Sequence, residues 1–147
     1  MHYFTDLDTL VDDVHGLFER WEEQYSTCEP FSLDTLMAAK LAIHEWVANL
    51  KRHATFAVPD PRVGLCVSPS ADGLACVVED NSVGFDLDGY FKKHGSITQV
   101  LPESGMGLHW IKSFANNLRY QRAPSGCQQL AFFVPDNNDP SLDILFS

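Results

Sequence analysis

The spacing of apolar residues predicts two amphipathic helices in the first third of the chain. In residues 6–25 they recur three and four positions apart, which is the period of one helix face. These residues are Leu7, Leu10, Val11, Val14, Leu17, Phe18 and Trp21. A second helix is predicted from Ser32, with the apolar stripe Leu36, Ala39, Ile43, Val47, Leu50 and Ala54. Residues 26–30, which include Pro30, separate the two helices.

The second predicted helix is unusual on its other face. Leu41, Glu45, Asn49 and His53 follow one another at four-residue steps. Each such step rotates by only about 40°, so these side chains share one side of the helix. The helix therefore has an apolar stripe on one face and, on the opposite face, the carboxylate of Glu45 and the amide of Asn49.

The rest of the chain alternates between strand-like and irregular segments. Residues 62–67 and 74–79 are predicted to pair as strands across the connection 68–73, and the continuous apolar run 74–78 suits an interior strand. A helix is expected from about 107 to 116, and a short one within 88–94. Residues 118–122 and 128–134 are expected to form a closing hairpin. Residues 1–4 form a weaker candidate for an edge strand. The chain is expected to be one domain over residues 1–147, with a loose tail from about residue 136.

Composition narrows the range of partners. The hydrophobic fraction of 45% is sufficient for a core, and the net charge is −10. Such acidity disfavours nucleic-acid binding and docking on anionic lipid, so neither a nucleic acid nor a membrane is expected as a partner. We find no apolar stretch of membrane-spanning length and no secretion signal, so a cytoplasmic location is expected. None of the four cysteines forms a C-x-x-C pair, and reduced thiols are the simplest interpretation.

Three segments carry side chains suited to binding a nucleotide. On the second helix, the amide oxygen of Asn49 is a hard ligand that suits Mg²⁺ together with phosphate oxygens. Glu45, one turn earlier, is placed to accept a proton from an attacking hydroxyl or water. For His53 we prefer a role in ending the helix, where a cation favours the dipole.

The second segment follows the apolar strand, and the third begins a predicted helix. Asp80, at the strand end, can accept a hydrogen bond from an exocyclic amine such as that of adenine. Gly84 allows the backbone to approach a flat ring without a Cβ clash. Gly105 and Gly107 place free N–H groups at a helix N-terminus, where phosphate is stabilised.

The order and spacing of these segments resemble the GHKL ATPases, and within them the anti-sigma-factor serine kinases. The sequence AIHEWVANLKRHA of residues 42–54 is similar to the N box of that family. Residues 78–86, VEDNSVGFD, look like its G1 box, and residues 104–111, SGMGLHWI, look like its G2 box. The resemblance extends from about Phe4 to Val134.

This resemblance implies a fold and a set of roles. The implied fold is an α/β two-layer sandwich, in which helices cover one face of a mixed, mostly antiparallel sheet. ATP and Mg²⁺ are the implied cofactors. Glu45 would be the general base, Asn49 would hold Mg²⁺ and Asp80 would bind the adenine amino group. The remaining residues implied in nucleotide binding are Ser82, Gly84, Gly105, Met106, Gly107, Leu108 and Cys127, with residues 87–104 as a lid.

The chain departs from the family pattern at three places. Ser82 stands where the family usually has the first Gly of D-x-G-x-G, and it fits if its φ is ordinary. Cys127 follows Gly126 where a Thr often helps to bind adenine through water, and a thiol is a poorer acceptor. The lid segment contains lysines and a histidine but no arginine.

The resemblance favours a serine/threonine protein kinase of the anti-sigma type. Such a kinase would phosphorylate an anti-anti-sigma (STAS-type) partner and would sequester a sigma factor in its other state. The alternative is a nucleotide-gated protein-binding module without phosphotransfer. A sensor histidine kinase is not expected, because it needs a dimerising helical pair with a phosphoacceptor histidine upstream, and one predicted helix precedes the N box here. A relic of the fold that binds no nucleotide is a further alternative. Homodimers are common in the resembling family, and the sequence leaves open whether this chain forms one.

Overall fold

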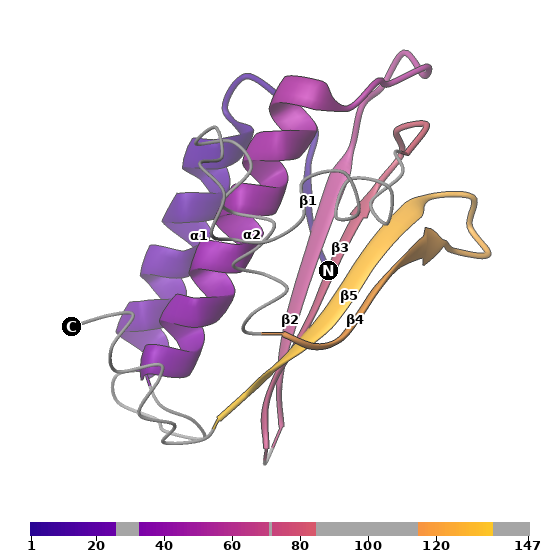
Figure 1. Ribbon diagram of the computed structural model, residues 1–147. Coiled ribbons are helices and arrows are strands. Elements are labelled where there is room, and N and C mark those ends of the chain that lie inside the picture. Colours follow the sequence, from indigo (N-terminus) through magenta and orange to yellow (C-terminus); the bar gives the residue numbers. More distant parts are fainter. Residues whose placement is uncertain (26–32, 71, 85–114, 137–147) are drawn as a thin grey trace, which may run out of the picture.

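Two helices pack side by side against one face of a five-stranded sheet (Figure 1). The computed structural model describes residues 1–25, 33–70, 72–84 and 115–136. Strand β1 (His2–Phe4) comes first, followed by helices α1 (Leu10–Tyr25) and α2 (Leu33–His53). Strands β2 (Val63–Ser70), β3 (Gly73–Asp80), β4 (Asn116–Arg122) and β5 (Gln128–Pro135) complete the described elements. Neither of the two described helices has the length and apolar character needed to cross a membrane.

The sheet has the order β1-β2-β3-β5-β4, and each of its four neighbouring pairs is antiparallel. The central strand β3 pairs with β2 on one side and with β5 on the other, so Val78 lies between Leu65 and Leu130. The structure confirms the predicted α/β two-layer sandwich with helices on one face. The weakly predicted edge strand at the N-terminus is also confirmed, as β1 pairs with β2.

The core lies between the helices and the sheet. Each strand of the central pair turns alternate residues towards the helices, as the period of two requires. The predicted stripe of α2 is confirmed, because Leu36, Ala39, Ile43, Val47 and Leu50 are fully buried. From α1 the core receives Leu10, Val14, Leu17 and Phe18. Burial of each large apolar side chain stabilises the fold by about 1.5–3 kcal/mol, which fixes both helices on the sheet.

Helix α1 begins later than the sequence pattern predicted. The carboxylate of Asp6 accepts a hydrogen bond from the backbone N–H of Asp8 at 2.9 Å, which holds a local turn in place of a first helical turn. Asp13 N donates to Thr9 O at 2.8 Å, with the four-residue spacing of an α-helix. The predicted start at residue 6 is therefore wrong by four residues, since α1 starts at Leu10.

Two further boundaries differ from the predictions. The connection between β2 and β3 is tighter than the predicted 68–73, because Ser68 pairs with Ala75 and Ser70 pairs with Gly73. The helix expected to end near 116 cannot include Asn116, which starts β4 and pairs with Phe133. The rest of that helix, the short helix within 88–94 and the loose tail after residue 136 lie outside the described residues.

Candidate functional site

Two of the three segments expected to form the site, on α2 and after β3, lie at the same end of the sheet. Helix α2 and strand β3 both end there, and β5 starts there, because Asp80 pairs with Gln128. The loop after β3 is joined to the segment after α2 by a hydrogen bond from Val83 N to Thr55 O at 2.9 Å. The fold thus brings the α2 and β3 segments together, although about 30 residues separate them in the sequence.

Asp80 is the most deeply buried charged residue of this edge, with 1% of its surface exposed. Its Oδ1 accepts hydrogen bonds from the backbone N–H of Ser82 at 3.0 Å and from the Ser82 hydroxyl. Its Oδ2 has no hydrogen-bond partner among the described residues. Burial raises the pKa of the Asp80 carboxyl above its usual value, and the two hydrogen bonds from Ser82 lower it in part. One acceptor atom is thus buried and free to bind a donor from a ligand.

Asn81 holds the loop after β3 in place. Its Oδ1 accepts from the backbone N–H of Arg62 at 2.8 Å, and its Nδ2 donates to the carbonyl of Asp60 at 2.9 Å. Sequence reasoning assigned no role to Asn81. Its position directly after a strand could have indicated this role, because an Asn side chain there often forms hydrogen bonds with the nearby backbone.

Ser82 and Gly84 continue this loop. Gly84 N donates to the Ser82 hydroxyl oxygen at 3.1 Å. Among described residues other than glycine, only Asn117 has a positive φ, so Ser82 fits in an ordinary conformation. Gly84 has φ +83°, and a Cβ there would lie 2.7 Å from Cδ of Gln128. The positive φ therefore favours glycine at position 84, and a larger residue would also displace the end of the Gln128 side chain.

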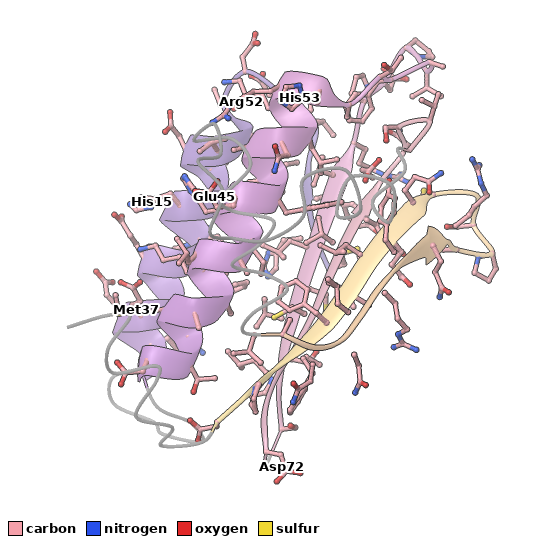
Figure 2. The ribbon with its side chains drawn as sticks, viewed as in Figure 1. His15, Met37, Glu45, Arg52, His53 and Asp72 are labelled. Atoms are coloured by element: carbon pink, nitrogen blue, oxygen red, sulfur yellow. The ribbon has the colours of Figure 1, made fainter. Side chains whose placement is uncertain are left out.

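The polar face of α2 runs along the helix towards this edge. Glu45 is half-buried, while Asn49 is buried and 7% exposed. Nδ2 of Asn49 has no partner among the described residues. His53 is the last residue of α2, so it lies where its expected role at the helix end requires, and the role itself stays a prediction. Figure 2 shows Glu45 and His53 along α2, with Asp72 at the opposite end of the molecule.

Sequence reasoning missed two residues near this site, Arg52 on the polar face of α2 and Gln128 at the start of β5. Arg52 is exposed, and it follows Glu45 at i+7 and Asn49 at i+3, so it shares their side of α2. Gln128 is 6% exposed and packs against Gly84. Alternation along β5 was the signal for Gln128, because the side chains of Leu130, Phe132 and Val134 on the same face are all buried.

Cys127 lies next to Gln128 but in a different environment. It is buried, and its Sγ accepts from the Arg62 guanidinium at 3.9 Å. The same guanidinium lies over the ring of Tyr3, 5.1 Å from its centroid. The adenine-binding role of Cys127 stays a prediction. Gly105, Met106, Gly107 and Leu108, together with the predicted lid, lie outside the described residues.

The sequence matches a family model over residues 6–131, and that family is the histidine kinase-like ATPase domain. The chain belongs to this family. The matched region contains every candidate site residue named above. No functionally curated protein matches the sequence of this ATPase domain.

Solved structures of histidine kinases resemble the ATPase domain in fold. One is the histidine kinase domain from the Erythrobacter litoralis EL346 blue-light activated histidine kinase, with a TM-score of 0.52 and 19% identity over 74% of this chain. Another is the Erythrobacter litoralis EL346 blue-light activated histidine kinase, with a TM-score of 0.51 and 17% identity over 76% of this chain. The ATPase domain spans 48% and 33% of the lengths of those two chains. At these identities the likeness concerns the fold.

The residues of the ATPase domain fit a magnesium ion that is bound mainly through phosphate. Asn49 offers one hard oxygen ligand at the buried edge of α2, and Mg²⁺ commonly takes one or two protein ligands along with phosphate oxygens and water. Among the described residues, no three His, Cys, Asp or Glu side chains converge. That part of the chain therefore holds no cage that would bind a metal without the nucleotide.

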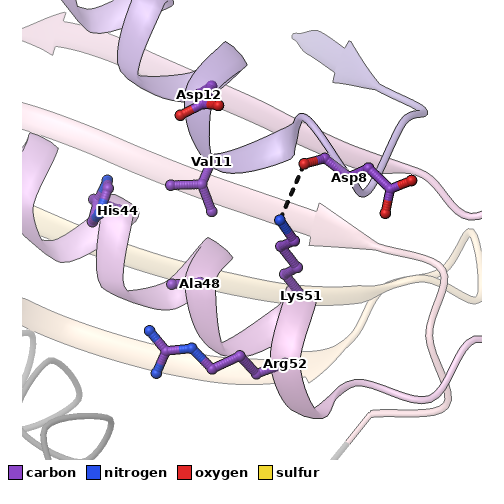
Figure 3. Close-up of a pocket in the computed structure, with 7 residues that line it drawn as sticks. All are labelled: Asp8, Val11, Asp12, His44, Ala48, Lys51 and Arg52. Atoms are coloured by element: carbon purple, nitrogen blue, oxygen red, sulfur yellow. Dashed lines mark hydrogen bonds between the residues drawn. The ribbon is translucent and has the colours of Figure 1, made fainter.

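A cavity lies between α1 and α2 (Figure 3). It has a volume of about 470 Å³. Lys51 closes one end by donating to the carbonyl of Asp8 at 3.1 Å. The acidic lining residues lie on α1 and in the segment before it, and the basic ones lie on α2. The lining residues are Asp8, Val11, Asp12, His44, Ala48, Lys51 and Arg52. This cavity includes neither Asp80 nor Gln128, but Arg52 belongs both to its lining and to the polar face of α2.

Proposed function

We propose that this chain binds Mg-ATP at the end of the sheet where α2 and β3 end and β5 begins. We further propose that it acts as a serine/threonine protein kinase of the anti-sigma type. The γ-phosphate would pass to a serine of an anti-anti-sigma (STAS-type) protein. In its other state the chain would sequester a sigma factor. Membership in a family of ATPase domains supports the nucleotide part of this proposal.

One observation carries the proposal. Asp80 Oδ2 and Asn49 Nδ2 are both buried, and neither has a hydrogen-bond partner among the described residues. Leaving a buried polar group unpaired costs about 1–3 kcal/mol, so two such groups at one edge of the fold favour a ligand that supplies their partners. An adenine amine is a donor that suits the free carboxylate oxygen of Asp80, and a phosphate oxygen is an acceptor that suits the free Nδ2 of Asn49. The amide oxygen of Asn49 would be the Mg²⁺ ligand.

Each residue has a separate role in this proposal. Asp80 orients the base, and Ser82 holds Oδ1 so that Oδ2 faces the ligand. Asn49 positions the metal and phosphates. Glu45, which is half-buried one turn earlier on α2, accepts the proton of the attacking serine hydroxyl. Phosphoryl transfer asks little more of a protein than positioning, a metal and a base.

The nucleotide part is tested by thermal melts with and without Mg-ADP or Mg-ATP. A ligand at about 100 times its Kd adds roughly 2.7 kcal/mol of stability, so the wild-type Tm should rise clearly. Asp80→Asn should abolish the rise. The matched control is Asp72→Asn, because Asp72 is an exposed residue of the β2–β3 turn at the opposite end of the sheet (Figure 2). No shift for the wild type at millimolar nucleotide would overturn the proposal.

The kinase part is tested by phosphoserine formation on a STAS-type anti-anti-sigma domain, followed by mass spectrometry. Glu45→Gln should keep the nucleotide-induced rise in Tm but lower the transfer rate by about 10²-fold or more, since it removes the base. Glu19→Gln is the matched control, because Glu19 is exposed on α1 and pairs with His15 at 2.9 Å. Binding without any transfer by the wild type would replace the kinase with the nucleotide-gated binding module.

A further inference from the structure

Helices α1 and α2 form an ion pair near one end of their interface but not near the other. Lys40 Nζ of α2 lies 3.1 Å from Glu22 Oε1 of α1. At the end where α1 begins and α2 ends, Asp12 and Arg52 carry opposite charges, and neither forms an ion pair within the described part of the chain. Both side chains line the cavity between the two helices, so both are available to a molecule bound there.

This cavity has an apolar base and a charged rim. Among its lining residues Ala48 is buried and Val11 is half-buried, whereas the aspartates, Lys51 and Arg52 are exposed. Figure 3 shows Lys51 directed at the segment before α1, where it donates to a backbone carbonyl, while the Arg52 side chain runs along α2. Lys51 is therefore engaged by the protein, and Arg52 is the cation that a ligand can reach. The volume of about 470 Å³ lies within the range of about 300–1,000 Å³ that is usual for small-molecule sites.

The distribution of charge around the rim selects the class of ligand. A small anion would be attracted by Arg52 but repelled by the carboxylate of Asp12, and a small cation would meet the reverse. A molecule that carries both charges satisfies both helices, if an apolar stretch separates its charged groups. His44 adds an imidazole on the α2 side, which can donate to the anionic group.

We propose that this cavity binds a small zwitterion, with its ammonium group at Asp12, its carboxylate at Arg52 and its apolar chain against the base of the cavity. Amino acids whose amine and carboxylate are separated by several methylene groups are the chemical class. This inference goes beyond the proposed function and does not rest on it, because the cavity lies outside the candidate nucleotide residues Asp80 and Asn49 and its binding is measured without nucleotide.

The test is a binding series with ω-amino acids of increasing chain length, measured by calorimetry on the full chain at low salt. The probes are β-alanine, γ-aminobutyrate and ε-aminocaproate, each compared with the carboxylic acid and with the amine of the same chain length. One length should bind most tightly, because the helices fix the span between Asp12 and Arg52. Its two singly charged analogues should each bind at least about fivefold more weakly, since each loses one charged contact.

Three variants locate the bound molecule. Asp12→Asn should weaken the best zwitterion about fivefold, without weakening the binding of its carboxylic acid analogue. Ala48→Leu fills the base of the cavity without changing its charge and should abolish binding, in a protein that a thermal melt shows to be folded. Asp13→Asn is the matched control, because Asp13 lies in the same first turn of α1 but does not line the cavity. Its new amide oxygen can still accept from the Thr9 hydroxyl, so binding should equal that of the wild type.

Three results would overturn the proposal. The first is the absence of saturable binding of every zwitterion at tens of millimolar. The second is equal binding of a zwitterion and its singly charged analogues, because the opposite charges of the rim would then select nothing. The third is an equal loss in Asp12→Asn and Asp13→Asn, which would assign the effect to the general charge of the first turn of α1. None of these results bears on nucleotide binding, so the proposed function would stand or fall separately.

Discussion

Ser82 donates both its backbone N–H and its hydroxyl to the same carboxylate oxygen of Asp80. This double contact fixes the orientation of a side chain that is only 1% exposed. It also leaves the second oxygen of Asp80 in an environment that disfavours its charge. This arrangement lowers the stability of the free protein, and in the proposed nucleotide site the ligand would supply the missing partner.

We expect Asp80→Asn to stabilise the free protein at neutral pH. Burial raises the folded-state pKa of Asp80, so the folded protein holds this proton more tightly than the unfolded chain does. The contribution of Asp80 is then most favourable below its unfolded pKa, near 3.8, and it is lost as the pH rises through the folded pKa. An uncharged asparagine at this position removes the loss of stability with rising pH, and its Oδ1 accepts both hydrogen bonds from Ser82.

The measurement is a thermal melt of both proteins without nucleotide at pH 7 and near pH 4. The Tm of Asp80→Asn should exceed that of the wild type by roughly 2–4 °C at pH 7, which corresponds to about 1 kcal/mol in a domain of this size. The difference should shrink towards pH 4. A lower Tm for Asp80→Asn at pH 7 would contradict the burial argument.

Gly84→Ala should destabilise the fold. The residue has φ +83°, and its new Cβ would contact Gln128. A strained backbone of this kind costs about 1–3 kcal/mol. Urea denaturation should show this loss without a change in the m-value. In the double variant with Gln128→Ala, the contact is relieved but the backbone strain stays, so only part of the loss should be recovered. Full recovery would show that contact alone requires glycine.

Thr35→Val should loosen the connection between α2 and the end of β5. The Thr35 hydroxyl is fully buried and donates to Asp136 Oδ1 at 2.7 Å. Val has a similar shape but cannot donate, so we expect a loss of about 1–3 kcal/mol in the free energy of unfolding. Thr55→Val, at an exposed position, is the matched control and should change stability by less than about 0.5 kcal/mol. Equal effects of the two changes would contradict this role.

The thiol of Cys76 should resist alkylation in the folded protein. Burial, with a smaller contribution from Cys66, raises the pKa of Cys76 to about 12, so little thiolate forms below pH 9. Cys66 is half-buried and should react with iodoacetamide first. Peptide mass spectrometry after timed labelling distinguishes the two thiols. Comparable labelling rates without denaturant would contradict the packing of β3, and denaturant should remove the difference.

Most of the fold could be predicted from the pattern of apolar residues. The stripe on α2 predicts a helix with a buried face, and the continuous apolar run of β3 predicts an interior strand. The structure confirms both, although Ala75 on the outer face of β3 is exposed. Boundaries were less well predicted, because local hydrogen bonds decide them. Asp6 holds a turn where the apolar spacing continues, and α1 starts only at Leu10.

For the candidate site, the sequence by itself determined the chemical types and their order along the chain. It indicated Glu45 and Asn49 on one helix face, because helical periodicity is a local property. It also indicated Asp80 at a strand end. Their roles in ATP binding stay predictions, as do those of Gly105 and Gly107.

Only the tertiary structure decided which groups meet and which atoms are left free. Gln128 lies beside Asp80 because β5 pairs with β3 in a particular register, and that register depends on packing across the whole sheet. The free oxygen of Asp80 depends on the turn that brings Ser82 back to it. Burial and hydrogen-bond pairing are properties of the assembled fold, so no local pattern in the sequence could state them.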